Sequence, residues 1–286
     1  MGESIAYLII RSLITLSGIL PKSWVYFLIK QFSLLFYFIS KRRREITITN
    51  LQEAFPKKSI EQIHTLSKDV FIELSKTISE ILFMLADKFD IDAAVINKEE
   101  ALNVLKKLDE DDPKGRIVIT AHFSNWELAA HFLAKHGYPM LAVGREGDNT
   151  LIDRKLTIPF REKYGNRSVY KKRAAISIMK TLKRDEIVGV LIDQKVDSKE
   201  GVKVKFFDRD VYTTSIVATM KEKIDIMILP IFLPRVGDGK YKMIIGDPVE
   251  RSGDVAEMTQ SYNDVMEKVI REYPAQWFWM HNRWKV

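Results

Sequence analysis

Short apolar runs rich in β-branched residues alternate with segments that have the hydrophobic period of a helix, and this alternation restricts the fold strongly. The predicted strands cover residues 116–121, 140–143, 187–192, 202–207, 226–232 and 241–245. The predicted helices between and after them cover residues 126–136, 151–164, 174–183, 214–223 and 255–272. Such alternation predicts an α/β domain with a largely parallel sheet flanked by helices.

Two features refine this prediction. Residues 226–232 and 241–245 are separated by Gly237-Asp238-Gly239, which predicts a hairpin and therefore a mixed sheet. Two further helices are expected upstream, at residues 59–86 and 98–108. With 286 residues, no internal repeat and no low-complexity linker, residues 45–286 are expected to form a single domain.

The amino-terminal segment contains no acidic residue between Ser4 and Arg44. Its apolar stretches, 5–20 and 24–40, precede a basic run at 41–44, whereas a cleaved signal peptide carries its charges first. The segment could be a pair of core helices. We favour a membrane anchor at residues 1–44, in-plane or spanning, because each basic residue beside anionic lipid contributes about 1 kcal/mol.

Composition and missing motifs exclude several classes of chemistry. The chain has no cysteine, which excludes disulfides, thiolate metal sites and a cysteine nucleophile. We find no phosphate loop, dinucleotide fingerprint, nucleophile elbow or His-Glu-x-x-His pair. His131 and His136 are too far apart around a helix to share a metal, and both are expected to be partly exposed. No metal and no cofactor are therefore predicted.

The net charge of +7 favours an anionic partner. Nucleic acid is not the expected one, because the aromatic residues cluster in the anchor and at residues 277–284 rather than among basic residues. Basic residues crowd the middle of the chain, where an acidic protein or a phosphorylated substrate could dock: Arg145, Arg154, Arg161, Arg167 and the run at 171–173.

His122 follows the predicted strand that ends at Ala121, and a helix is expected to begin near Ser124 or Asn125. The imidazole would then lie at the carboxyl end of a strand, where open α/β sheets bind ligands. Glu127 could fold back onto one ring nitrogen, which leaves the other free to take a proton from a hydroxyl. Alternatively, Ser124 and Glu127 form a helix capping box with no catalytic role.

Residues 120–128 resemble the His-x4-Asp/Glu motif of the lysophospholipid acyltransferase superfamily. The Asn125-Trp126-Glu127 form is similar to that of the lipid A late (lauroyl/myristoyl) acyltransferases and the related phosphatidylinositol-mannoside acyltransferases. Further matches follow in the family's order: Arg161 in 160–165, Asp193-Gln194, 205–207, 230–235 and 274–285. The chain departs from the pattern at Lys195, at Asp208 and at Asn149-Thr150.

The resemblance implies an acyl carrier protein as acyl donor and a hydroxyl of a lipid A precursor as acceptor, at the cytoplasmic face of a bacterial inner membrane. It implies catalysis by His122 and Glu127. Substrate-binding roles are expected for Asn125, Trp126, Arg145, Arg161 and Asp193.

For two of these residues a simpler interpretation stays open. Arg161 could bind the oxyanion or a phosphate, or form only a surface ion pair. Asp193 could support the site or only form a turn. The alternatives for the whole chain are glycerolipid or phosphatidylinositol-mannoside acyl transfer, and a non-catalytic membrane scaffold.

Overall fold

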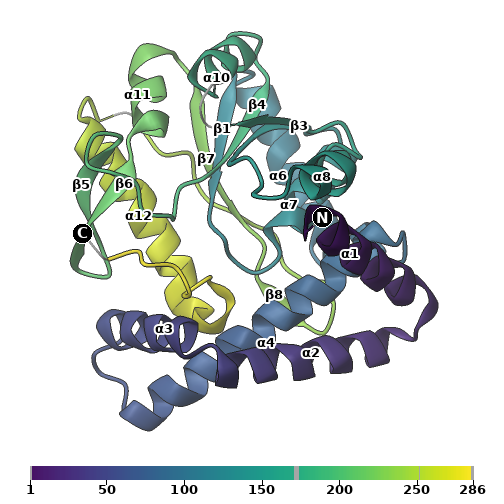
Figure 1. Cartoon of the computed structure of the whole chain (residues 1–286). Coiled ribbons are helices and arrows are strands. Elements are labelled where there is room, and N and C mark those ends of the chain that lie inside the picture. Colours follow the sequence, from purple (N-terminus) through teal and green to yellow (C-terminus); the bar gives the residue numbers. More distant parts are fainter. Residues whose placement is uncertain (1, 171–173, 251, 285–286) are drawn as a thin grey trace.

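The central sheet has six strands in the order β10-β7-β1-β4-β2-β3 (Figure 1). The computed structural model describes residues 2–170, 174–250 and 252–284, so the basic run at 171–173 and Lys285 lie outside the described residues. Within this central sheet, all strand pairs are parallel except β10 with β7, which confirms the predicted mixed, largely parallel sheet. The strands are β1 (Arg116–Thr120), β2 (Met140–Gly144), β3 (Arg167–Tyr170), β4 (Ile187–Leu191), β7 (Met227–Phe232) and β10 (Ile244–Ile245).

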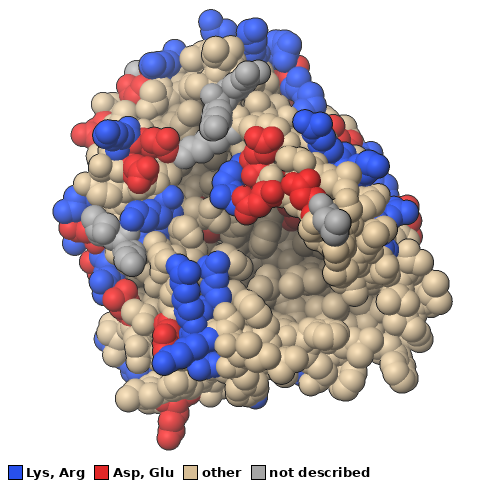
Figure 2. Space-filling view, viewed as in Figure 1, with Lys and Arg blue, Asp and Glu red and all other residues tan. Residues whose placement is uncertain are grey.

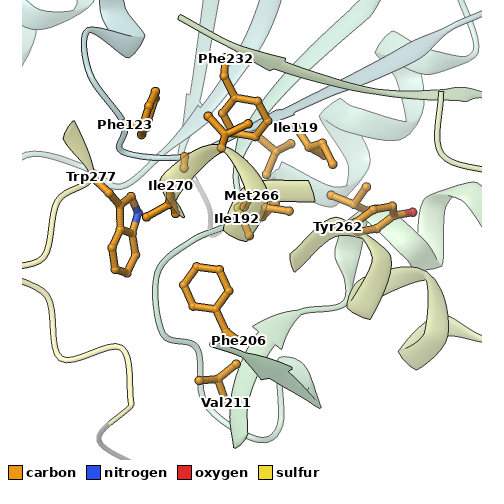
Figure 3. Packing of buried hydrophobic residues seen from close by; sticks show 14 of the residues in the cluster. Ile119, Phe123, Ile192, Phe206, Val211, Phe232, Tyr262, Met266, Ile270 and Trp277 are labelled. Atoms are coloured by element: carbon orange, nitrogen blue, oxygen red, sulfur yellow. The ribbon is translucent and has the colours of Figure 1, made fainter. Parts of the chain in front are cut away.

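Helices cover both faces of the sheet because successive side chains of its buried strands point to opposite sides. Ile117 and Ile119 of β1 belong to one buried cluster, whereas Val118 belongs to the other. Figure 3 shows the first cluster, where Ile119 and Phe232 of the sheet lie near Met266 and Ile270. That face is covered by α10 (Ala174–Leu182), α11 (Ile216–Lys223) and α12 (Val255–Glu272), and the other by α6 (Lys98–Asp111) and α7 (Trp126–Lys135).

Four helices form the amino-terminal part: α1 (Gly2–Ile19), α2 (Lys22–Ile39), α3 (Lys41–Ala54) and α4 (Ile60–Leu85). α4 begins with a capping box between Ser59 and Gln62, and α1 and α2 both pack against it (Figure 1). The chain bends by 87° between α2 and α3. The outward faces of α1 and α2 are apolar and exposed, and by length and composition α1 is able to cross a membrane.

The structure differs from the sequence-based expectation in several places. The predicted strand at 202–207 lies outside the main sheet, as β5 (Gly201–Phe206) paired with β6 (Arg209–Thr214). The predicted hairpin is present as the β7–β10 pair, with a smaller hairpin of β8 (Arg235–Gly237) and β9 (Lys240–Tyr241) between them. Short elements that the sequence did not reveal are β3, β6 and α5 (Ile91–Ala94), together with the 3₁₀ turn Pro274–Gln276.

The helix expected at 151–164 is broken into α8 (Thr150–Ile152), one π-helical turn (Asp153–Thr157) and α9 (Ile158–Arg161). Asp153 is buried inside this segment, and its carboxylate accepts hydrogen bonds from the backbone N–H of Gly147 and from the hydroxyl of Tyr170. These contacts hold the segment against the residues that follow β2 and against the end of β3. The turn at Asp153–Thr157 is π-helical, which means that it contains one residue more than an α-helical turn.

Candidate active site

His122 and Asp193 are brought together by the register of two neighbouring strands. Thr120 of β1 pairs with Leu191 of β4, so His122 and Asp193 each lie two residues beyond that pair. Because the strands are parallel, both residues leave the sheet at its carboxyl edge, the usual ligand site of open α/β sheets. The Nδ1 atom of His122 lies 2.9 Å from Oδ1 of Asp193.

Asp193 is buried, and both of its carboxylate oxygens accept hydrogen bonds. Its Oδ2 atom accepts a hydrogen bond from the backbone N–H of His122 at 3.0 Å and one from the indole N–H of Trp277 at 2.8 Å. Burial favours the neutral carboxyl group, but the charge of His122 and these hydrogen bonds outweigh it and hold the pKa of Asp193 below its usual value. Asp193 is therefore an ionised carboxylate that orients the imidazole.

The side chain of His122 is about a quarter exposed, with Nδ1 directed inward. Burial disfavours the imidazolium, but the charge and hydrogen bond of Asp193, with a further contribution from Glu127, hold the pKa of His122 above its usual value. With Nδ1–H donated to Asp193, Nε2 is the ring atom that can accept a proton from a hydroxyl.

Glu127 does not occupy the position that the sequence suggested. Its carboxylate accepts hydrogen bonds from Nε of Arg161 at 3.0 Å and from Nη2 of the same guanidinium at 2.6 Å. The expectation that Glu127 binds a ring nitrogen of His122 was therefore wrong, because Asp193 holds that position. Glu127 lies on the first turn of α7 and acts on His122 through its charge.

The Arg161 guanidinium lies on α9 and is partly exposed. Its ion pair is with Glu127, not with the neighbouring Glu162, so the simple surface ion pair considered from the sequence is also not the contact observed. The pair joins the broken helical segment to the turn that carries His122.

Asn125, not Ser124, caps α7. The side-chain oxygen of Asn125 accepts the backbone N–H of Leu128, so the alternative capping box of Ser124 with Glu127 does not form. Ser124 has a φ of 52°, a left-handed conformation that costs energy in residues other than glycine and is often found at functional sites. The Trp126 ring packs edge-on against the imidazole of His122, with 5.2 Å between ring centroids.

Two other expectations concern residues farther from the imidazole. Arg145 follows β2 at the same edge of the sheet, but its guanidinium pairs with Asp148 and is largely exposed. His131 was expected to be partly exposed and is buried, where its ring nitrogens contact the backbone oxygens of Glu127 and Phe160. Within the described ranges, no three His, Asp or Glu side chains gather as metal ligands.

The carboxy-terminal segment closes the site from one side, which sequence reasoning did not anticipate. Phe278 donates its backbone N–H to the oxygen of His122 at 3.0 Å, and Ser124 donates its own N–H to Gln276. Trp277 lies beside Phe123 in the core shown in Figure 3. A groove opens beside His122 between this segment and α4, lined by Val70, Leu74, Thr77, Trp126, Ala275 and Phe278.

Gln194 was also overlooked as a site residue. Its side-chain amide nitrogen lies 3.3 Å from Nε2 of His122. The available signal was the Asp193-Gln194 pair at the end of a strand, but a pattern within one strand does not reveal which strand is its neighbour.

Comparison with known proteins shows which family the chain belongs to. The chain is 28% identical over 251 residues to the lipid A biosynthesis lauroyltransferase of Escherichia coli (strain K12), covering 86% of this chain and 80% of the relative. It is 25% identical to the palmitoleoyltransferase of the same organism, with the same coverage. A phosphatidylinositol mannoside acyltransferase of Mycolicibacterium smegmatis is 22% identical over 61% of this chain and 58% of its own length. Residues 2–286 match the family described as bacterial lipid A biosynthesis acyltransferase, and the chain therefore belongs to that family.

Proposed function

We propose that this protein is a membrane-associated O-acyltransferase that moves a fatty acyl chain from acyl carrier protein to a hydroxyl of a lipid A precursor. The observation that carries the proposal is the hydrogen bond between His122 and Asp193 at the carboxyl edge of the sheet, in a chain of this family. His122 is the base, Asp193 orients it, and Glu127 adds negative charge that favours the imidazolium.

The reaction follows from this arrangement. Nε2 of His122 takes the proton of the acceptor hydroxyl as the oxygen attacks the thioester carbon. The tetrahedral oxyanion then collapses, the carbon–sulfur bond breaks, and the imidazolium returns the proton to the leaving thiolate. A positioned base of this kind contributes about 10²–10⁴-fold to the rate.

The amino terminus of α7 supports stabilisation of the oxyanion. The helix begins at Trp126, directly after the turn of His122, so the backbone N–H groups of Trp126 and Glu127 belong to its first turn. Such groups have no partner within their own helix and carry the positive end of the helix dipole. Arg161 remains the candidate for a phosphate group of the acceptor, with Glu127 holding the guanidinium in place.

The position of α1 supports membrane association in the plane of the interface. One end of α1 is attached to α8, because Asn149 and Thr150 both hydrogen-bond Glu3. At the other end, Lys88 donates to the carbonyl oxygen of Leu20 at 2.5 Å. A helix of 18 residues, about 27 Å long, lies flat on the domain when both ends are attached to it. Residues 1–44 would therefore enter the lipid side-on, at the cytoplasmic face of the inner membrane.

The basic run at 41–44 has a role beyond lipid binding. Arg44 donates to the carbonyl oxygens of Tyr37 and Phe38, which lie in the last turn of α2. Arg43 donates to the carbonyl oxygen of Met280, in the carboxy-terminal segment. Lys41 and Arg42 are exposed and are the residues of this run best placed to meet anionic headgroups.

The test is an assay with purified protein, an acyl carrier protein thioester and a lipid A precursor. Transfer by the wild-type protein and loss of at least 10²-fold in a folded His122→Ala variant are expected. Undiminished transfer by that variant contradicts the role of His122, and a non-catalytic scaffold would show no transfer at all. Mass spectrometry of lipid A from a deletion strain separates the alternative: an unchanged set of acyl chains favours transfer to a glycerolipid or to a phosphatidylinositol mannoside, the acceptor in the mycobacterial relative's name.

A further inference from the structure

The proton-accepting nitrogen of His122 faces an amide. Among the described residues, Gln194 is the side chain at hydrogen-bonding distance from Nε2, with its amide nitrogen 3.3 Å away. Because Nδ1–H is donated to Asp193, Nε2 of the neutral ring carries a lone pair, and the amide of Gln194 acts as the donor to it. The amide therefore occupies the direction from which a substrate hydroxyl has to approach.

The backbone of Gln194 is held in place while its side chain is exposed. The carbonyl oxygen of Gln194 accepts a hydrogen bond from the buried Arg283 at 3.3 Å. The next backbone N–H, that of Lys195, donates to Nε2 of His281 at 2.9 Å. The amide can thus swing about its own side-chain torsions without any movement of the strand end that positions Asp193.

We propose that Gln194 is a catalytic residue with two roles. Before the acceptor binds, its side-chain amide donates to Nε2 of His122, at the position that the acceptor hydroxyl later takes. When that hydroxyl reacts, the amide donates a hydrogen bond to the oxyanion. This inference rests on the proposed acyl transfer and adds a residue to it.

The distance between the amide nitrogen of Gln194 and Nε2 of His122 supports the first role, and the second role follows from it. A hydroxyl oxygen that gives its proton to Nε2 must lie about 2.7–3.0 Å from it, so it displaces the amide nitrogen that lies 3.3 Å from the same atom. The displaced amide remains beside the reacting hydroxyl, and the acyl carbonyl oxygen is bonded to the carbon under attack. An N–H donor so placed stabilises the charge that develops on that oxygen.

The kinetic test compares variants of one position with a matched glutamine elsewhere. Gln194→Ala is expected to lower kcat/KM by about 10²-fold, the usual effect of losing one such donor, and Gln194→Asn to lie between it and wild type. Gln194→Glu should be at least as slow as the alanine variant, because a carboxylate cannot donate. Gln52→Ala, an exposed glutamine on α3, should match wild type. If His122→Ala loses activity while Gln194→Ala does not, the role of Gln194 is refuted and the proposed function stands.

A second measurement needs no substrate. NMR titration of the His122 ring, assigned by its loss in His122→Ala, should give a higher pKa in Gln194→Ala, because a donor to the neutral nitrogen has been removed. The pKa should rise further in Gln194→Glu and stay unchanged in Gln52→Ala. An unchanged titration in both Gln194 variants overturns the contact with Nε2, even if the wild-type protein proves to act on another acceptor and the proposed function fails.

Discussion

The imidazole of His122 lies among three charged side chains with opposing effects. Asp193 and Glu127 favour the imidazolium, whereas Arg161 and burial disfavour it. The net result is a raised pKa, which makes His122 a stronger base but leaves a larger fraction protonated at a given pH. The acidic limb of the pH–rate profile should therefore lie above the ordinary pKa of histidine, about 6.5.

Replacing Asp193 by Asn tests this balance. The substitution removes the main influence that favours the imidazolium while burial remains, so the pKa of His122 falls and the acidic limb moves to lower pH. An Asn amide can also donate to Nδ1 and select the wrong tautomer, so kcat should drop by about 10²–10⁴-fold. The pH profile of log(kcat/KM) measures the shift of the limb, and kcat at saturating substrate measures the drop. A limb that stays in place or moves upward contradicts the assigned role of Asp193.

Glu127 and Arg161 should have opposite effects on the same limb. Glu127→Gln removes a negative charge and moves the limb to lower pH, whereas Arg161→Gln removes a positive charge and moves it to higher pH. The double variant should lie nearer to wild type than either single variant, since the two groups form one ion pair. Arg145→Gln is the control, because Arg145 pairs with Asp148 instead. Shifts of the same sign in both single variants would falsify this electrostatic assignment.

The limits of sequence reasoning are clear at this site. The position of His122 at a strand end followed from a local pattern, because the strand and the next helix were both visible in the hydrophobic period. Its partner did not follow, because Asp193 is near His122 only if β4 lies next to β1, and strand order is a property of the whole sheet. Glu127 was the nearer carboxylate in sequence, but one turn of helix places it against Arg161.

At the scale of elements, α4 connects α1 and α2 to the turn that carries His122. Glu80 of α4 is fully buried and accepts hydrogen bonds from Tyr26 of α2 and from Asn125, the cap of α7. It also binds Arg235 at 2.8 Å and the hydroxyl of Tyr241. One carboxylate thus fixes elements from four parts of the chain, including the turn that carries His122.

Removing this carboxylate should be costly. Glu80→Ala leaves the buried Arg235 with fewer partners, and breaking a buried ion pair from one side costs about 3–5 kcal/mol. Glu61→Ala, an exposed position on the same helix, should change stability by no more than about 1 kcal/mol. Urea unfolding followed by circular dichroism measures both variants. Equal midpoints for the two variants would show that the network adds little to stability.

Helices with a strong hydrophobic period could be predicted from the sequence. Elements whose position or shape depends on contacts with distant parts of the chain could not. α2 and α4 were expected within two residues of their ends, since long amphipathic helices carry their own signal. The predicted strand at 202–207 was assigned to the main sheet, because the sequence of a short apolar strand does not show which sheet it joins. The break at Asp153 depends on contacts with Gly147 and Tyr170, which local sequence does not reveal.

At the scale of the molecule, the uncharged surface and the active site are neighbours. Figure 2 shows a broad area without charged residues over α1 and α2, beside a hollow in the same face. The groove next to His122 is lined by α4, the helix on which α2 packs. A protein lying on lipid by α1 and α2 would hold its base close to the bilayer surface, where an acylated acceptor resides. The exposed apolar side chains of α1 and α2 include Leu8, Ile9, Trp24, Phe27, Phe32 and Phe38.

This placement predicts how the full chain binds lipid. Phe32 and Phe38 of α2 are both more than half exposed, so a double Phe→Glu variant should fold normally and yet lose binding to vesicles of phosphatidylethanolamine and phosphatidylglycerol. Burying one such side chain contributes about 1.5–3 kcal/mol, so the loss should reach about 10²-fold or more in co-sedimentation. Ile176→Glu is the matched control, since Ile176 is equally exposed but lies on α10. Alkaline carbonate should release the wild-type protein from membranes, because an in-plane anchor does not cross the bilayer. Protein that stays in the carbonate-resistant pellet would mean that α1 leaves the domain and spans the membrane.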